Sequence, residues 1–176
     1  MKRLAVLACA CSLLLVGCDK SINPVVPSGV ATLAAQLSGA SNVPPAGSLE
    51  AGATGSLQIT MTPAAGGGYT ASFSIRLSGL VKAGILPSPL DSGSVIVAGY
   101  IHQGGAGTLG APVLALPISQ TAPILSPTGT VLLTLSGVSV PAATATAILA
   151  NPSGFYFNLY SALNQNGVLR GQLVAQ

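Results

Sequence analysis

The side chains that could carry acid–base or metal chemistry are few. The 176 residues include six Lys and Arg, three Asp and Glu, and one His. A zinc or copper site normally takes three or four ligands from His, Cys and carboxylates, so His102, Glu50 and Asp91 would all have to converge. We expect instead that His102 ends a buried strand and hydrogen-bonds a turn of the loop at residues 104–110. The domain is therefore predicted to hold no metal and no cofactor.

Enzymatic arrangements are equally hard to assemble. A Ser-His-Asp triad is formally possible, with His102 as the base and Asp91 as the acid that orients it. However, the chain has no Gly-x-Ser-x-Gly motif to present the serine nucleophile. A glycosidase needs two facing carboxylates, and nothing in the sequence brings Glu50 and Asp91 together. Residues 105–110 match Gly-x-Gly-x-x-Gly, yet Pro112 follows where a nucleotide-binding helix would begin. The sequence therefore predicts a protein that is not an enzyme.

Arg170 and three tyrosines are further candidates for function. Arg170 lies in mid-strand, where its five donors could bind loop carbonyls or pair with Asp91 or Glu50. A structural clamp is favoured over a ligand-binding role. Tyr100, Tyr156 and Tyr160 form either an aromatic ligand patch or part of the core, and the core is favoured.

The charge pattern excludes one class of partner. Beyond the first 17 residues, four bases face three acids, a net charge of +1, and the bases are scattered singly. Binding to a phosphate backbone needs clustered Lys and Arg. Nucleic acid is therefore excluded as a partner.

The N-terminal segment has the pattern of a secretory leader. Met1-Lys2-Arg3 is basic, and residues 4–16 are almost wholly apolar, too short for a membrane span of about 20 residues. Leu15-Val16-Gly17-Cys18 resembles a bacterial lipobox. We expect residues 1–17 to be a signal peptide, cleavage before Cys18, and lipidation of Cys18 with acyl chains such as palmitate. Several acyl chains on one residue give stable anchoring.

The expected location follows from this leader. Cys9 and Cys11 would leave with it, so the folded domain has no cysteine for a disulfide or thiolate site. Residues 18–29 contain two prolines and predict a lipid anchor with a short tether. The protein is expected in a bacterial cell envelope, anchored to the inner or outer membrane, with its domain in the periplasm or at the cell surface.

From Val30 to Gln176 the pattern predicts one β domain. Apolar and polar residues alternate over residues 57–61 and 69–78, and residues 94–102 are apolar on both faces, as in a central strand. Residues 130–135, 155–160 and 168–174 are further predicted strands. Gly66-Gly67-Gly68 and Asn166-Gly167 indicate turns, and only residues 142–150 have helical character. Short strands with Gly and Pro turns predict an antiparallel β-sandwich.

Three stretches together resemble the CHRD domain, a family named after chordin. They are Leu37-Ser38-Gly39-Ala40 with Val43-Pro44-Pro45 and Gly52-Ala53-Thr54-Gly55, then Tyr100-Ile101-His102-Gln103-Gly104-Gly105-Ala106-Gly107 with Gly110-Ala111-Pro112-Val113, and finally Tyr156-Phe157-Asn158-Leu159-Tyr160-Ser161 with Gly167-Val168-Leu169-Arg170-Gly171-Gln172-Leu173. The resemblance spans about residues 31–174. It implies an all-β sandwich, immunoglobulin-like or superoxide-dismutase-like, and no settled activity. Tyr100 and Tyr160 stand where the family pattern has histidines, and Val168 where it has an acid.

The sequence thus predicts a membrane-anchored envelope lipoprotein with a non-catalytic binding or structural module. The candidate ligand-binding or structural residues are His102, Arg170, Tyr100, Tyr160 and Asn158. Expected partners are the membrane, through the N-terminal lipid, and an envelope protein or polysaccharide, contacted by residues 103–111 and 162–167. The domain itself is expected to be monomeric. Two alternatives stay open: a metal-binding protein related to superoxide dismutases, and a self-associating structural surface protein.

Overall fold

The computed structural model describes residues 29–47, 49–85 and 92–176. The expected signal peptide, Cys18, nearly all of the tether and Asp91 lie outside these residues. The strands are β1 (Ala31–Ser38), β2 (Thr54–Pro63), β3 (Tyr69–Ser78), β4 (Ser94–Gln103), β5 (Pro112–Ala115), β6 (Ile124–Ser126), β7 (Val131–Val140), β8 (Phe155–Ser161), β9 (Leu169–Gln172) and β10 (Val174–Ala175). The helices are η1 (Gly39–Ser41), α1 (Ala142–Ala150) and η2 (Pro152–Gly154), of which η1 and η2 are 3-10 turns.

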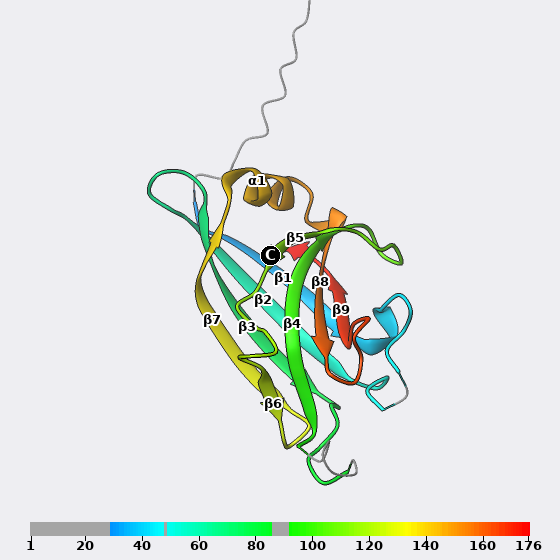
Figure 1. The fold of residues 1–176 in the computed structure, drawn as a ribbon. Coiled ribbons are helices and arrows are strands. Elements are labelled where there is room, and N and C mark those ends of the chain that lie inside the picture. The colour runs from blue at the N-terminus through cyan, green and yellow to red at the C-terminus, as the bar shows by residue number, and fades with distance from the viewer. Residues whose placement is uncertain (1–28, 48, 86–91) are drawn as a thin grey trace, which may run out of the picture.

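One antiparallel sheet makes up the body of the domain. Its strand order is β5-β4-β8-β9-β1-β2-β3-β7, with β6 also paired to β4 and β10 to β1. The sheet curls so that β4 and β8 lie across from β2 and β3, and α1 lies at one end of the body (Figure 1). All-β architecture, antiparallel pairing and a sandwich-like packing are therefore confirmed, with the two layers belonging to one continuous sheet. The likeness to immunoglobulin or superoxide dismutase folds stays a prediction.

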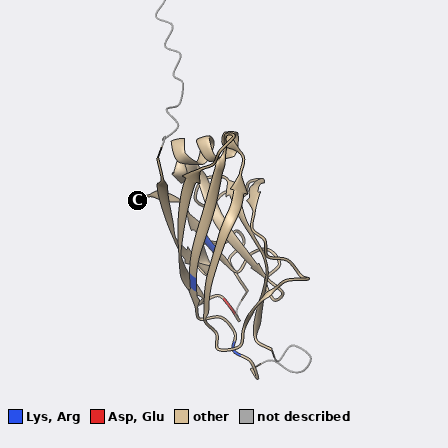
Figure 2. Cartoon of the chain, turned by 90° about the vertical axis from the view of Figure 1, so that its left-hand side faces the viewer, with Lys and Arg blue, Asp and Glu red and all other residues tan. Residues whose placement is uncertain are grey.

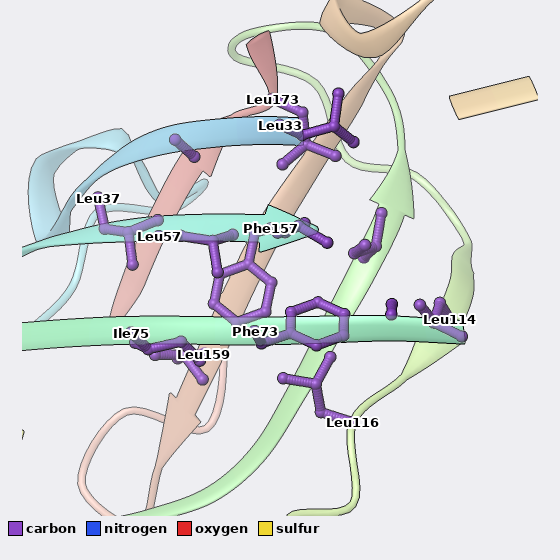
Figure 3. Close-up of a cluster of buried hydrophobic side chains, with 14 of the residues drawn as sticks. Leu33, Leu37, Leu57, Phe73, Ile75, Leu114, Leu116, Phe157, Leu159 and Leu173 are labelled. Atoms are coloured by element: carbon purple, nitrogen blue, oxygen red, sulfur yellow. The ribbon is translucent and has the colours of Figure 1, made fainter. Parts of the chain in front are cut away.

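The hydrophobic core fills the space between the two halves of the curled sheet. Leu57, Phe73 and Ile75 from β2 and β3 point toward Phe157 and Leu159 from β8 (Figure 3). All five are at most 2 % exposed. Alternation along each strand sends every second side chain to this core and the others to the opposite face. That opposite face is where the polar candidate residues lie.

The local predictions mostly agree with the structure. The strand at residues 69–78, the central strand β4 and the helix at residues 142–150 are confirmed. The strand predicted at 130–135 runs on to Val140, and the one at 168–174 is divided into β9 and β10. The β8–β9 hairpin exists, but its turn is longer than a two-residue Asn-Gly turn, and only Gly167 has positive φ. Strands β1, β5 and β6 were not delimited by the sequence pattern.

Charge is sparse over the described residues. Figure 2 shows isolated blue Lys and Arg segments and a red acidic segment on an otherwise tan ribbon. Within the described residues, no helix has the length and apolar character needed to cross a membrane.

Candidate functional site

The polar candidates gather on the face of β4, β8 and β9 that is turned away from the core. Tyr100 and His102 alternate along β4, while Tyr156, Asn158 and Tyr160 alternate along β8. The register pairs His102 with Tyr156 and Asn158 with Arg170 of β9. We call the side chains of Tyr100, His102, Tyr156 and Tyr160 the aromatic cluster.

His102 is the centre of this cluster and is only 7 % exposed. Its ring stacks on Tyr156 with centroids 4.9 Å apart and planes 3° apart. Its Nδ1 lies 2.9 Å from the carbonyl oxygen of Gly110, so Nδ1 must carry a hydrogen and donate it. In the neutral ring Nε2 then accepts the hydroxyl hydrogen of Tyr160, 3.1 Å away. The predicted hydrogen bond from His102 to the 104–110 loop is thus present.

Burial keeps His102 neutral. Loss of water around the ring lowers the pKa of His102, and the nearby positive charge of Arg170 lowers it further, while the bond to the Gly110 carbonyl acts in the opposite direction. Burial also raises the pKa of the Tyr160 hydroxyl. The Tyr160 hydroxyl therefore keeps its proton, and the neutral imidazole donates through Nδ1 and accepts through Nε2.

Arg170 acts as a clamp on the loop at residues 103–111. It is 2 % exposed, and its Nη2 donates to the carbonyls of Gly105 (2.9 Å) and Thr108 (2.7 Å). Its guanidinium carbon lies 3.5 Å from the centre of the Tyr156 ring, a cation–π contact. The expected loop-carbonyl bonds are therefore found, whereas Glu50 is bound elsewhere.

The rest of the 103–111 loop is held just as firmly. The hydroxyl of Tyr156 accepts the N–H of Gly110 at 3.1 Å, and Gln172 donates to the carbonyl of Gly104 at 2.8 Å. A Cβ at Gly110 would lie 1.5 Å from the carbonyl oxygen of Gln103, so only glycine fits there. The glycines of the Gly-x-Gly-x-x-Gly match therefore serve loop closure.

The tyrosines agree only in part with the expected placement in the core. Tyr156 is among the buried hydrophobic residues, but all three tyrosines lie outside the main hydrophobic cluster, on the opposite face of the sheet. Tyr156 is 1 % exposed because the loop covers it, whereas Tyr100 and Tyr160 are half-buried. Their rings meet edge to face, with centroids 5.7 Å apart. Tyr100 and Tyr160 therefore keep surface that a ligand could contact.

Asn158 lies deeper in the same face, 4 % exposed. Its Oδ1, like that of Asn42, is buried without a hydrogen-bond partner. A Cβ at Gly167 would lie 2.4 Å from Asn42 Oδ1 and 2.9 Å from Asn158 Oδ1. Gly167 thus lets the β8–β9 turn pack against these two amides, which gives Asn158 a structural position under the turn.

Glu50 forms a second polar cluster that the sequence did not reveal. It is fully buried, and its carboxylate accepts hydrogen bonds from Ser94, from Ser161 (2.6 Å) and from Asn164 (2.6 Å). Asn164 in turn accepts the N–H of Gly47 at 2.6 Å. We call Glu50, Ser94, Ser161 and Asn164 the Glu50 knot. It ties the loop before β2 to β4 and to the β8–β9 turn.

The aromatic cluster and the Glu50 knot have separate hydrogen-bond partners within the described residues. The carboxylate of Glu50 is occupied in its knot, and both ring nitrogens of His102 are occupied in the aromatic cluster. The described residues contain no group of three His, Cys, Asp or Glu side chains able to hold a metal. Asp91, the third expected ligand, lies outside them.

Two surface hollows border candidate residues, and a third lies on the β1–β3 part of the sheet. One of about 430 Å³ lies beside the two exposed tyrosines, and we call it the Tyr100–Tyr160 hollow. A second, about 300 Å³, lies between residues 40–43 and Arg170. A third, about 430 Å³, lies on the outer face of β1–β3, and we call it the Arg76 hollow.

A comparison with models of known protein families identifies the family of this chain. The model of the CHRD domain matches residues 33–173. The chain belongs to the CHRD family. The match includes all three stretches that carry the resemblance. Two of them meet at Tyr156, whose ring stacks on His102 and contacts the Arg170 guanidinium. No curated protein and no solved structure matches the chain.

Proposed function

We propose that this protein is a lipid-anchored bacterial envelope lipoprotein whose CHRD domain is a non-catalytic binding module. One observation carries the non-catalytic part. The described residues bury one acidic, one basic and one imidazole side chain, those of Glu50, Arg170 and His102. Each of the three is hydrogen-bonded within the protein. Arg170 and Glu50 are engaged in structural hydrogen bonds, and the hydroxyl that His102 accepts belongs to Tyr160 rather than to Ser or Thr, as in a hydrolytic triad.

The anchor rests on the leader and on Cys18. Strand β1 begins at the same end of the sheet as α1. Its first residue, Ala31, pairs with Met61 near the end of β2, and the hairpin from β2 leads to Tyr69 at the start of β3. Tyr69 pairs with Val140, the last residue of β7, and α1 begins two residues later. In the proposed arrangement, a tether before β1 holds this end of the domain toward the membrane. The β8–β9 turn lies at the other end, so an anchored domain would present it away from the lipid surface.

The anchor is tested by replacing its cysteine. We expect the full-length protein to sediment with membranes after a high-salt wash and to incorporate labelled palmitate. Cys18→Ala should lose both properties, while Cys11→Ala, which removes a leader cysteine, should keep them. Equal membrane partitioning and labelling of Cys18→Ala and the wild type would overturn the proposal. Stoichiometric zinc or copper in protein purified without chelators would overturn its non-metal character.

Self-association is a second candidate function, and strand β7 favours it. β7 is an edge of the sheet with ten residues, none of them charged and none of them Pro. Such an edge offers backbone groups to a further strand, and Leu132 is 66 % exposed on it. Sedimentation of the protein in detergent across a range of concentrations tests this, since a monomer throughout would exclude it.

A further inference from the structure

The Tyr100–Tyr160 hollow forms where the edge of β4 lacks a neighbouring strand. Along that edge, β6 pairs with Ser94–Ile96 and β5 with Tyr100–His102, and the Gly99 carbonyl accepts the N–H of Leu116 at 2.9 Å, which leaves Val97 and Ala98 between the two ladders. Pro117 and Pro123 lie in the segment between β5 and β6, and proline has no N–H to give a ladder. A hollow of about 430 Å³ lies between this segment and the residues of β4 and β8 beside it. That volume falls within the range of about 300–1,000 Å³ typical of small-molecule sites.

The walls of the hollow combine aromatic rings with neutral polar groups. The residues that matter for recognition are Tyr100, Tyr160, Ile118, Ser119, Gln120 and Gln165. The hydroxyl and carboxamide groups supply both donors and acceptors. The two tyrosine rings supply rigid apolar surface at small entropic cost. No acidic or basic side chain of the described residues lines it.

One of these polar groups is fixed in advance. The hydroxyl hydrogen of Tyr160 is committed to Nε2 of His102, since Nδ1 donates to the Gly110 carbonyl. The phenol oxygen is therefore an acceptor, with the Asn158 side chain bonded to it, and Tyr160 lines the hollow. A ligand hydroxyl can donate to this oxygen without first reorienting it, which lowers the entropic cost of binding.

These properties select one ligand class. A charged ligand would lose its hydration without gaining a counter-charge, because Arg170 is buried and bonded to loop carbonyls. A purely apolar ligand would leave the amides and hydroxyls unpaired. A neutral sugar fits both kinds of lining residue. Its C–H faces pack on the tyrosine rings, and its hydroxyls hydrogen-bond the polar side chains. Building on the function proposed above, we propose that the Tyr100–Tyr160 hollow binds neutral oligosaccharides.

Calorimetric titration of the full-length protein in detergent tests this site. The neutral probes are hexamers of β-1,4-glucose, α-1,4-glucose and β-1,4-N-acetylglucosamine, and the anionic probe is a galacturonic acid hexamer. We expect at least one neutral hexamer to bind and the anionic one not to bind. Gln165→Ala and Tyr100→Ala should each weaken binding at least tenfold, whereas Gln58→Ala, an exposed amide on β2, should leave it unchanged.

Each outcome decides the proposal. If no neutral hexamer binds, if the anionic one binds better, or if Gln165→Ala and Tyr100→Ala both bind like the wild type, the sugar site is overturned. Gln165 is exposed on a turn, so its variant reports on binding even where Tyr100→Ala loses its fold. If no sugar binds but a cross-linker at Gln165 still captures an envelope protein, the sugar site is wrong and the proposed binding module is retained. Loss of lipidation at Cys18 is a separate failure.

Discussion

The Tyr100–Tyr160 hollow and the Arg76 hollow have the same volume, about 430 Å³ each, but are built in different ways. The first takes its walls from two strands, the 116–123 segment and the β8–β9 turn. The second is lined by three neighbouring strands alone, β1, β2 and β3. Behind the first, His102 fixes the Tyr160 hydroxyl. At the second, Gln36 and Arg76 are exposed and face solvent.

The difference shows which half of this sheet carries a second layer of contacts. On the β1–β3 half, polar side chains alternate outward and remain in water. On the β4–β8–β9 half, the outward side chains of Tyr156 and Arg170 are buried and hydrogen-bonded to the loop at residues 103–111, whereas the buried Oδ1 of Asn158 has no partner. That second layer of contacts holds the rim of one hollow in a fixed arrangement. The predictions below test this contrast, beginning with the largest effect.

Removing Glu50 should damage the β4–β8 half most. In Glu50→Ala, Ser94, Ser161 and Asn164 lose their acceptor in a fully buried site. We expect the free energy of unfolding to fall by about 3–5 kcal/mol. Urea denaturation followed by circular dichroism measures this. A loss below about 1 kcal/mol, the scale of an ordinary hydrogen bond, would contradict a role for the Glu50 knot in stability.

The two arginines give a matched comparison of the halves. Arg170→Lys keeps the charge but loses the planar group that donates to Gly105 and Thr108 and contacts Tyr156, so we expect a loss of about 1–3 kcal/mol. Arg76→Lys, at an exposed position, should change stability by less than about 0.5 kcal/mol. Equal losses of unfolding free energy in Arg170→Lys and Arg76→Lys would contradict the difference proposed between the two halves of the sheet.

His102 should make stability depend on pH, and it is the chain's single histidine. Burial lowers its pKa in the folded protein below the 6.5 of the unfolded chain, so unfolding takes up a proton between those two values. The stabilisation is complete above pH 6.5 and decreases as the pH falls toward the folded pKa, by at most about 1.4 kcal/mol per pH unit. Denaturation from pH 5 to 8 should show this slope for the wild type and not for His102→Gln.

The smallest effect on stability is expected at the β7 edge. Leu132→Lys puts a charge on an exposed position, so the free energy of unfolding should change by less than about 0.5 kcal/mol. If β7 pairs with another copy, the charge should abolish that association. An assembly that persists unchanged in Leu132→Lys would show that β7 is not the contact.

Alternation and turn residues made the strands predictable, and the local roles of His102 and Arg170 followed from their positions near a glycine-rich loop. The Glu50 knot could not be predicted, since its partners lie 44, 111 and 114 positions away and a glutamate in a Gly- and Ala-rich segment gives no local signal. The Tyr100–Tyr160 hollow was also hidden. It depends on a gap between two short strands, β5 and β6, which the sequence pattern did not delimit.

In the proposed function, the β4–β8–β9 half carries the binding surface. A photo-cross-linking amino acid replacing Gln165, and in a second variant Gln58, tests it in the full-length anchored protein in its envelope. Both positions are exposed amides, and only Gln165 borders the Tyr100–Tyr160 hollow. Illumination should give a discrete cross-linked product, glycan or protein, from position 165 and none from position 58. Products from position 58 alone would contradict the account.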